Sequence, residues 1–169
     1  MARTPLQHIE ALKDRLVPSI LPDAAWATFN AQDFTCPNTF AAHYQQAAGV
    51  PTWLFRYFGD WDSLRLYPTS GAYHGSDVEM IFGASEDVSG LPELEPERET
   101  QALMMHAWAT FADDPVNGLA GLGWPTYNQS KDSLVELAYN NSPVPRFVAP
   151  STFASVSPSL NLTWHEIDT

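Results

Sequence analysis

The chain has 169 residues, of which 44% are hydrophobic and 17% are charged. This length and composition are typical of one globular domain with an apolar core and exclude a disordered chain. Twenty acidic and eight basic residues give a net charge of −12. Such a chain repels polyanions, so we expect neither nucleic acid nor an anionic membrane surface as a partner.

The first predicted element is a helix over residues 5–17. Thr4 offers a capping hydroxyl, Pro5 suits the first helical position, and Pro18 ends the pattern. Between them, apolar residues recur at helical spacing: Leu6, Ile9, Leu12, Leu16 and Val17. Neither this segment nor any other has the roughly 20 consecutive apolar residues of a membrane span, so we expect no membrane-spanning helix.

A second helix and a strand follow. Pro37, after a cap at Thr35 or Cys36, predicts a helix that ends at Gly49. The run of β-formers from Val50 to Phe58 comes directly after it and is too continuous for a half-exposed strand. We therefore expect a strand covered on both faces. A helix, a glycine and a buried strand in this order indicate the α/β class.

The rest of the chain contains one clear helix and one further strand. Residues 61–77 are rich in Pro, Ser, Gly and aromatic residues and predict a long ordered loop, and residues 83–95 predict an exposed acidic excursion. Residues 97–113 predict a helix with an apolar stripe of Leu103, Met104, Ala107, Trp108 and Phe111. Residues 134–139 predict a strand, and no periodicity follows from Asn141 onward. So few strands do not complete an α/β sheet. Either the missing strands lie elsewhere, or the α/β interpretation is wrong.

The motifs for common cofactors are missing from the sequence. It contains no glycine-rich dinucleotide or phosphate loop, no zinc-protease motif and no calcium loop. No two of the five histidines are three or four residues apart, which argues against a metal site. We therefore expect no cofactor and no metal.

Among the histidines, His74 is the candidate functional residue. The other four are expected to be solvated or packed side chains: His8, His43, His106 and His165. His74 instead lies between Gly71 and Gly75 on a loop downstream of the predicted strand. Glycines let a loop present a side chain sharply, and working residues of α/β proteins concentrate on loops beyond strand ends.

Four stretches of the sequence carry a family resemblance. In chain order they are VPTWLFRYFGDW, LYPTSGAYHGSDVEMIFG, MMHAWATFADDP, and WPTYN with LVELAYNN. In this order they resemble the end of type-B carboxylesterases and lipases, the cholinesterase-like α/β-hydrolases, most strongly over residues 34–139. The resemblance implies that residues 1–169 are a single partial domain, the C-terminal portion of an α/β-hydrolase fold, with an incomplete sheet and packed helices.

The resemblance also implies a chemistry. The match at Gly71, His74, Gly75 and Asp77 implies that His74 is the acid/base histidine of a serine ester hydrolase acting on small-molecule or lipid esters. Asp77 is expected to brace the loop. The family's serine elbow and acidic residue precede the histidine, and no Gly-x-Ser-x-Gly occurs here. We therefore expect a fragment, from a truncated gene or one exon, that is inactive alone.

Two other functions remain open. The first is a non-catalytic, cholinesterase-like binding or adhesion domain, although a retained histidine favours the enzyme. The second is an independent acidic interaction domain, which predicts cooperative unfolding of the isolated chain. The upstream sequence, with or without an elbow serine, decides between enzyme and binding domain.

Cysteine and sequon patterns bear on the compartment. The single cysteine, Cys36, excludes an internal disulfide. Its counterpart in cholinesterase-like relatives pairs with a cysteine of a later helix. The helix predicted over residues 97–113 has no cysteine, so a lost disulfide, an upstream partner and a free thiol all remain open.

N-glycosylation sequons begin at Asn128, Asn140 and Asn161. With the resemblance they favour an extracellular glycoprotein.

Overall fold

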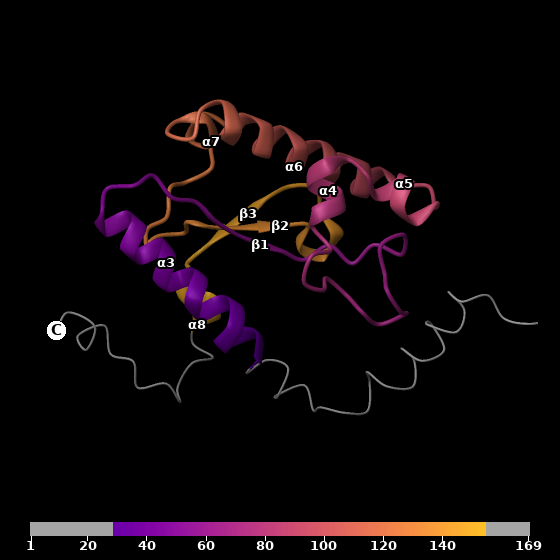
Figure 1. Ribbon diagram of the computed structural model, residues 1–169, viewed down its shortest axis with the longest axis horizontal. Helices are drawn as coiled ribbons and strands as arrows, with labels where there is room; N and C mark the ends of the chain where they lie inside the picture. Colours follow the sequence, from indigo (N-terminus) through magenta and orange to yellow (C-terminus); the bar gives the residue numbers. More distant parts are fainter. Residues whose placement is uncertain (1–28, 155–169) are drawn as a thin grey trace, which may run out of the picture.

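The computed structural model describes residues 29–154, in which helices lie on both sides of a small sheet (Figure 1). The described elements, in chain order, are η1 (Ala31–Thr35), α3 (Cys36–Ala47), β1 (Leu54–Tyr57), α4 (Val78–Phe82), α5 (Ser85–Ser89), α6 (Glu95–Asp113), α7 (Gly118–Gly121), β2 (Leu134–Leu137), η2 (Tyr139–Asn141), β3 (Arg146–Val148) and α8 (Ser151–Ala154). The helix predicted over residues 5–17 lies outside the described residues.

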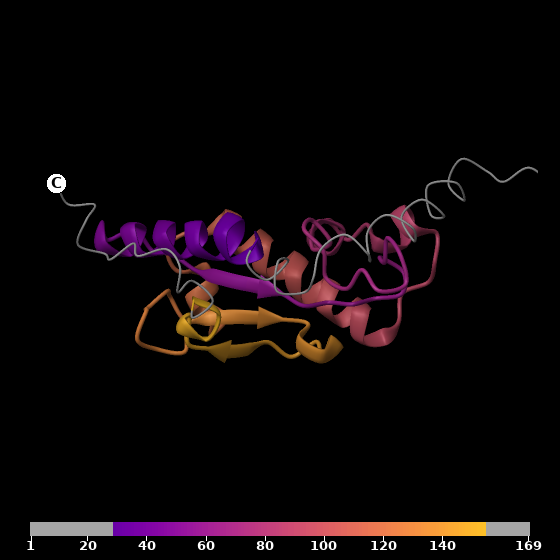
Figure 2. The same cartoon turned by 90° about the horizontal axis from the view of Figure 1, so that it is seen from below.

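The sheet has the order β1-β2-β3. β1 and β2 are parallel, with Leu54 opposite Leu134, and β2 and β3 are antiparallel, with Glu136 opposite Arg146. Figure 1 shows α6 on one side of the three strands and α3 on the other, and Figure 2 shows the strands next to one another in the same order. Helices on both sides of a sheet that includes a parallel pair confirm the predicted α/β class.

The core lies between β2, α6 and the loop after β1. Its buried members are Trp61, Leu64, Met80, Met104, Ala107, Leu119, Trp124, Val135, Leu137 and Ala138. The apolar stripe predicted for α6 is confirmed at Met104 and Ala107, which are buried, and at Leu103 and Trp108, which pack against the core. The prediction is wrong at Phe111, whose side chain is 42% exposed.

β1 differs from its prediction in length and in burial. It has four residues instead of the nine expected, because Pro51 has no N–H and the Thr52 carbonyl accepts a hydrogen bond from the Tyr127 N–H (2.7 Å) outside the sheet. It is not covered on both faces, since Phe55 is 37% exposed and its neighbours are half-buried. Within residues 29–154 only β2 pairs with it. The continuous run of β-formers predicted the strand correctly and its burial wrongly.

The remaining elements agree in part with their predictions. Residues 61–77 contain no helix or strand, as expected, but the acidic excursion contains α5, and β3 and α8 were not predicted. α6 begins two residues early, at Glu95, and Glu97 in its first turn accepts a hydrogen bond from the Leu94 N–H (3.2 Å). Among residues 29–154, no helix has both the length and the apolarity that a membrane crossing requires.

Candidate functional site

His74 lies on the loop that joins β1 to α4. Gly71 (φ 57°) and Gly75 (φ 91°), on either side of it, adopt left-handed backbone conformations that favour glycine. The N–H of Ser76 donates to the carbonyl of Tyr73 (3.0 Å), which closes a tight turn around the histidine. The sequence expectation that these glycines shape the loop is therefore confirmed.

The start of this loop is fixed to the end of β2 through Asp60. The Asp60 N–H donates to the Asn141 side-chain oxygen (2.9 Å), and the Asn141 amide donates back to the Asp60 carbonyl (2.8 Å). The Arg65 guanidinium donates to both Asp60 carboxylate oxygens, at 2.6 and 2.9 Å. The hydrogen bonds from Arg65 hold the pKa of the Asp60 carboxyl below its ordinary range. The backbone at the start of the histidine loop is therefore held in place by Asn141 and Arg65.

The middle of the loop is fixed to α6 and to β1. The Ser63 hydroxyl donates to the carboxylate of Glu97, a residue only 1% exposed at the start of α6. The Trp61 indole N–H donates to the Tyr57 hydroxyl oxygen (2.7 Å). Burial raises the pKa of Tyr57, and Glu97 adds to this rise against the opposing hydrogen bond from Trp61. The Tyr57 phenol therefore remains neutral and able to donate a hydrogen bond.

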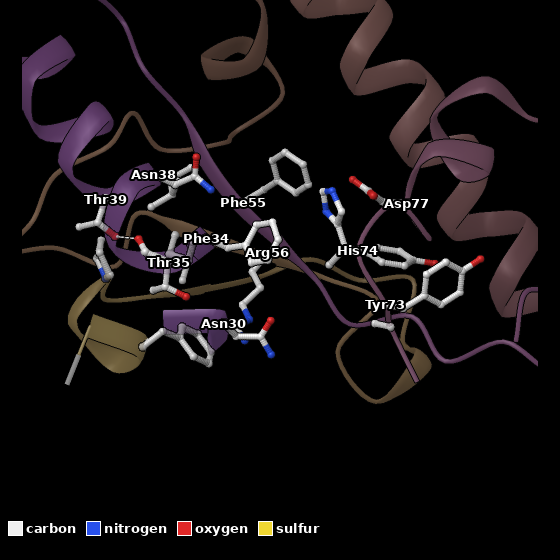
Figure 3. A pocket seen from close by; sticks show the side chains of 17 residues that line it. Asn30, Phe34, Thr35, Asn38, Thr39, Phe55, Arg56, Tyr73, His74 and Asp77 are labelled. Carbon is white, nitrogen blue, oxygen red and sulfur yellow. Dashed lines mark hydrogen bonds between the residues drawn. The ribbon is translucent and has the colours of Figure 1, made fainter. Parts of the chain in front are cut away.

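His74 is exposed and lines an open pocket of about 290 Å³ (Figure 3). The pocket lies between η1 and the start of α3 on one side and β1 with the histidine loop on the other. The Phe34 ring packs against the imidazole, with ring centroids 4.8 Å apart and planes tilted by 39°. Arg56 also lines the pocket and lies 4.4 Å from the centroid of the Phe153 ring. The pocket therefore combines aromatic surface with hydrogen-bonding groups.

Asp77 lines the same pocket but does not brace the loop as expected. Its carboxylate makes no hydrogen bond within residues 29–154, and the contacts of Asp60 and Glu97 hold the loop instead. The same part of the chain supplies no hydrogen bond to the imidazole of His74. Within the described residues, no acid is hydrogen-bonded to the imidazole of His74 to orient it.

The other candidate residues are placed as follows. His43 is half-buried in α3 and His106 is exposed on α6, as predicted, while His8 and His165 lie outside the described residues. The described residues contain no group of three metal-ligating side chains. Cys36 forms no disulfide in this part of the chain.

Four aromatic residues around β1 and the histidine loop differ in what they contact. Trp61 is buried in the core, at 3% exposure, whereas Tyr73 lines the pocket of His74. Tyr57 does both, since it packs against the core and also lines that pocket. Trp53 packs against the core. Sequence reasoning did not find Phe34, because the only sign of its role is a tertiary contact with a loop far along the chain.

The comparisons with known proteins identify the class. The sequence profile of the carboxylesterase family matches residues 13–154, and the chain belongs to this family. The family has the α/β-hydrolase fold, and the three-stranded sheet described here is a partial sheet of that class.

Three curated relatives illustrate the similarity. Secreted lipase 5 of Gibberella zeae is 30% identical over 108 residues, which cover 63% of this chain and 20% of the lipase. Chlorogenic acid esterase of Aspergillus niger is 25% identical over 118 residues, covering 61% and 23%. Carboxylesterase 4A of Bos taurus is 33% identical over 97 residues, covering 56% and 17%. The matched region thus spans about a fifth of the length of these relatives.

Proposed function

We propose that this chain supplies the general acid/base histidine, His74, of a serine carboxylic-ester hydrolase. The observation that carries the proposal is the position of His74: a glycine-hinged loop beyond the end of β1 presents it to an open pocket, in a chain of the carboxylesterase family. His74 takes the proton from a serine hydroxyl as that oxygen attacks the ester carbonyl. It then returns the proton to the departing alkoxide, which leaves as the alcohol.

In this proposal residues 1–169 are one partial domain, and the serine, the acid and the oxyanion hole come from the rest of the fold. Support comes from the relatives, which are about five times longer than the region they share with this chain. The imidazole of His74 also supports the proposal. Residues 29–154 supply no hydrogen bond to it, which leaves its nitrogens available to a serine and an acid from the rest of the fold. The substrates are small-molecule or lipid esters, and the isolated chain is inactive.

The test is a single-chain hybrid in which the 169-residue chain replaces the matched stretch of secreted lipase 5. We expect the hybrid to hydrolyse a p-nitrophenyl ester, and His74→Ala to lower kcat by about 10³-fold or more with little change in KM. His106→Ala, on the exposed side of α6, is the matched control and leaves kcat unchanged. A hybrid equally active without His74 would refute the assignment, as would His74-dependent turnover by the isolated chain.

We also propose that the protein is extracellular and glycosylated. One relative is named a secreted lipase. Asn140 is exposed, Asn128 is half-buried at a turn in which its side-chain oxygen accepts a hydrogen bond from the Ser130 N–H (2.9 Å), and Asn161 lies outside the described residues. A mass decrease of the secreted protein on enzymatic deglycosylation checks the proposal, and an unchanged mass contradicts it.

A further inference from the structure

Arg56 brings a positive charge to the pocket of His74. The residue is half-buried on β1, and within residues 29–154 it is the only Arg or Lys that lines this pocket. Its guanidinium carbon lies 4.4 Å from the centroid of the Phe153 ring and 5.6 Å from that of Phe58. No acceptor among these residues receives a hydrogen bond from the guanidinium. Its N–H groups are therefore available to a ligand.

The carboxylate opposite Arg56 in the sheet is already paired with another residue. Glu136 lies opposite Arg56 on β1 and opposite Arg146 on β3, so the three residues form one row across the sheet. Glu136 is only 1% exposed, and its Oε2 accepts a hydrogen bond from the Arg146 Nε (2.8 Å) and lies 2.6 Å from the Arg146 Nη2. Burial lowers the pKa of Arg56, and the attraction of Glu136 opposes this effect only in part. The row thus holds two guanidiniums and one carboxylate, and Arg56 is the one left without a hydrogen-bonded acid.

A half-buried guanidinium without an acceptor favours an anionic ligand. Guanidinium groups bind carboxylates and phosphates through paired hydrogen bonds. A single guanidinium in a chain of net charge −12 matches the single charge of a carboxylate better than the higher charge of a phosphate. We propose that Arg56 binds a carboxylate of the substrate, so that the substrates are esters that also carry a free carboxylate. This inference rests on the proposed function and names a substrate class for the same site.

The other groups of the pocket fit one orientation of such a substrate. Figure 3 shows Arg56 and Asp77 on opposite sides of His74. An anion is repelled at Asp77 and attracted at Arg56, which directs the carboxylate to Arg56 and leaves the ester near His74. Phe34 packs against the imidazole and Phe153 against the guanidinium, and both line the pocket. This apolar surface suits a hydrocarbon chain between the carboxylate and the ester.

The test measures the specificity of the single-chain hybrid with secreted lipase 5. Its substrates are monoethyl esters of dicarboxylic acids of increasing chain length, each paired with the ethyl ester of the monocarboxylic acid of the same length. The measured quantity is the ratio of kcat/KM for the carboxylated ester to kcat/KM for its neutral partner. We expect Arg56→Gln to lower this ratio about tenfold or more at the preferred chain length, mainly by raising KM for the carboxylated ester.

A second variant and a control accompany Arg56→Gln. Asn30→Asp adds a negative charge at an exposed residue of the same pocket, and we expect it to lower the ratio without removing any packed side chain. Arg98→Gln removes a guanidinium from the exposed surface of α6, outside the pocket, and is the matched control. The control should keep the ratio of the unsubstituted hybrid.

Three results would overturn the inference in an active hybrid and leave the proposed function intact. The first is a ratio that neither Arg56→Gln nor Asn30→Asp changes. The second is an equal fall of the ratio in Arg98→Gln, which would reflect net charge alone. The third is an unchanged ratio with a loss of unfolding free energy in Arg56→Gln and none in Arg98→Gln. The guanidinium would then bind a carboxylate of the remaining polypeptide.

Binding without turnover separates this inference from the proposed function. Isothermal titration calorimetry measures the Kd of the same monoesters in the hybrid that carries His74→Ala. We expect Arg56→Gln to raise this Kd about tenfold or more. Binding that depends on Arg56, together with turnover that does not depend on His74, would refute the proposed function and keep the carboxylate site. Binding that does not depend on Arg56 would overturn the inference whether or not the hybrid is active.

Discussion

At Gly59, directly after β1, the chain has no room for a side chain. A Cβ there would lie 2.2 Å from the Tyr57 hydroxyl oxygen and 2.5 Å from the Trp61 indole nitrogen, between the two groups of one hydrogen bond. We expect Gly59→Ala to lower the free energy of unfolding by about 2 kcal/mol, measured by urea unfolding of the single-chain hybrid with secreted lipase 5.

Gly121, at the end of α7, is the control for this substitution. A Cβ there meets nothing within 4 Å, so Gly121→Ala should be neutral or slightly stabilising. Equal effects of the two substitutions would show that the hydrogen bond between Tyr57 and Trp61 leaves space for a methyl group at Gly59.

Single residues of the site were predictable when their signal is local. The left-handed backbone at Gly71 and Gly75 can be anticipated because glycine readily adopts positive φ. Phe34 beside His74 and Glu97 beneath the loop could not be anticipated, since each acts through a contact distant in sequence. From the sequence alone, Glu97 is a negative charge near a helix N-terminus, where such charges are favourable. Only the fold shows that its carboxylate is buried and accepts a hydrogen bond from Ser63.

At the scale of elements, Asn141 connects the end of β2 to the start of the histidine loop. Its side chain makes two hydrogen bonds to the backbone of Asp60, while Asn140 beside it makes none of these. Both residues have positive φ, 56° and 54°, so an alanine suffers the same backbone cost at either position. We expect Asn141→Ala to cost about 1–2 kcal/mol more than Asn140→Ala. Urea unfolding of the two variants measures the difference, and equal losses would mean that the connection contributes no stability.

Sequence reasoning succeeded for long elements and failed for short ones. α6 has enough turns for its apolar period to emerge, so its extent was predicted to within two residues. β3 has only three residues, follows Pro143 and Pro145, and is specified by its pairing with β2 rather than by any pattern of its own. The burial of β1 was misjudged for a related reason, because burial depends on neighbouring strands that a single run of residues does not encode.

At the scale of the whole molecule, the two sides of the sheet differ in how well they are packed. The core cluster lies on the side of α6, whereas Ala42 is the only buried residue of α3. The α3 side of the sheet instead faces the open pocket of His74. The described part of the chain is therefore tightly packed where it supports the loop and open where it meets the site.

A second opening lies on the α6 side of the sheet. We call it the aromatic groove: a cavity of about 340 Å³ whose lining includes Trp53, Phe55, Trp108, Phe111, Leu119 and Trp124. An exposed cluster of aromatic side chains binds a hydrophobic dye such as anilinonaphthalene sulfonate even in a folded protein. We expect the isolated chain to enhance the dye's fluorescence, and Phe111→Asp to reduce the enhancement by roughly half or more. Phe82→Asp adds the same charge at a residue that is 74% exposed but outside the groove, and should leave the enhancement unchanged. Equal reductions would mean that general charge repulsion, rather than the groove, controls dye binding. An unaltered signal in both variants would place the dye at another surface.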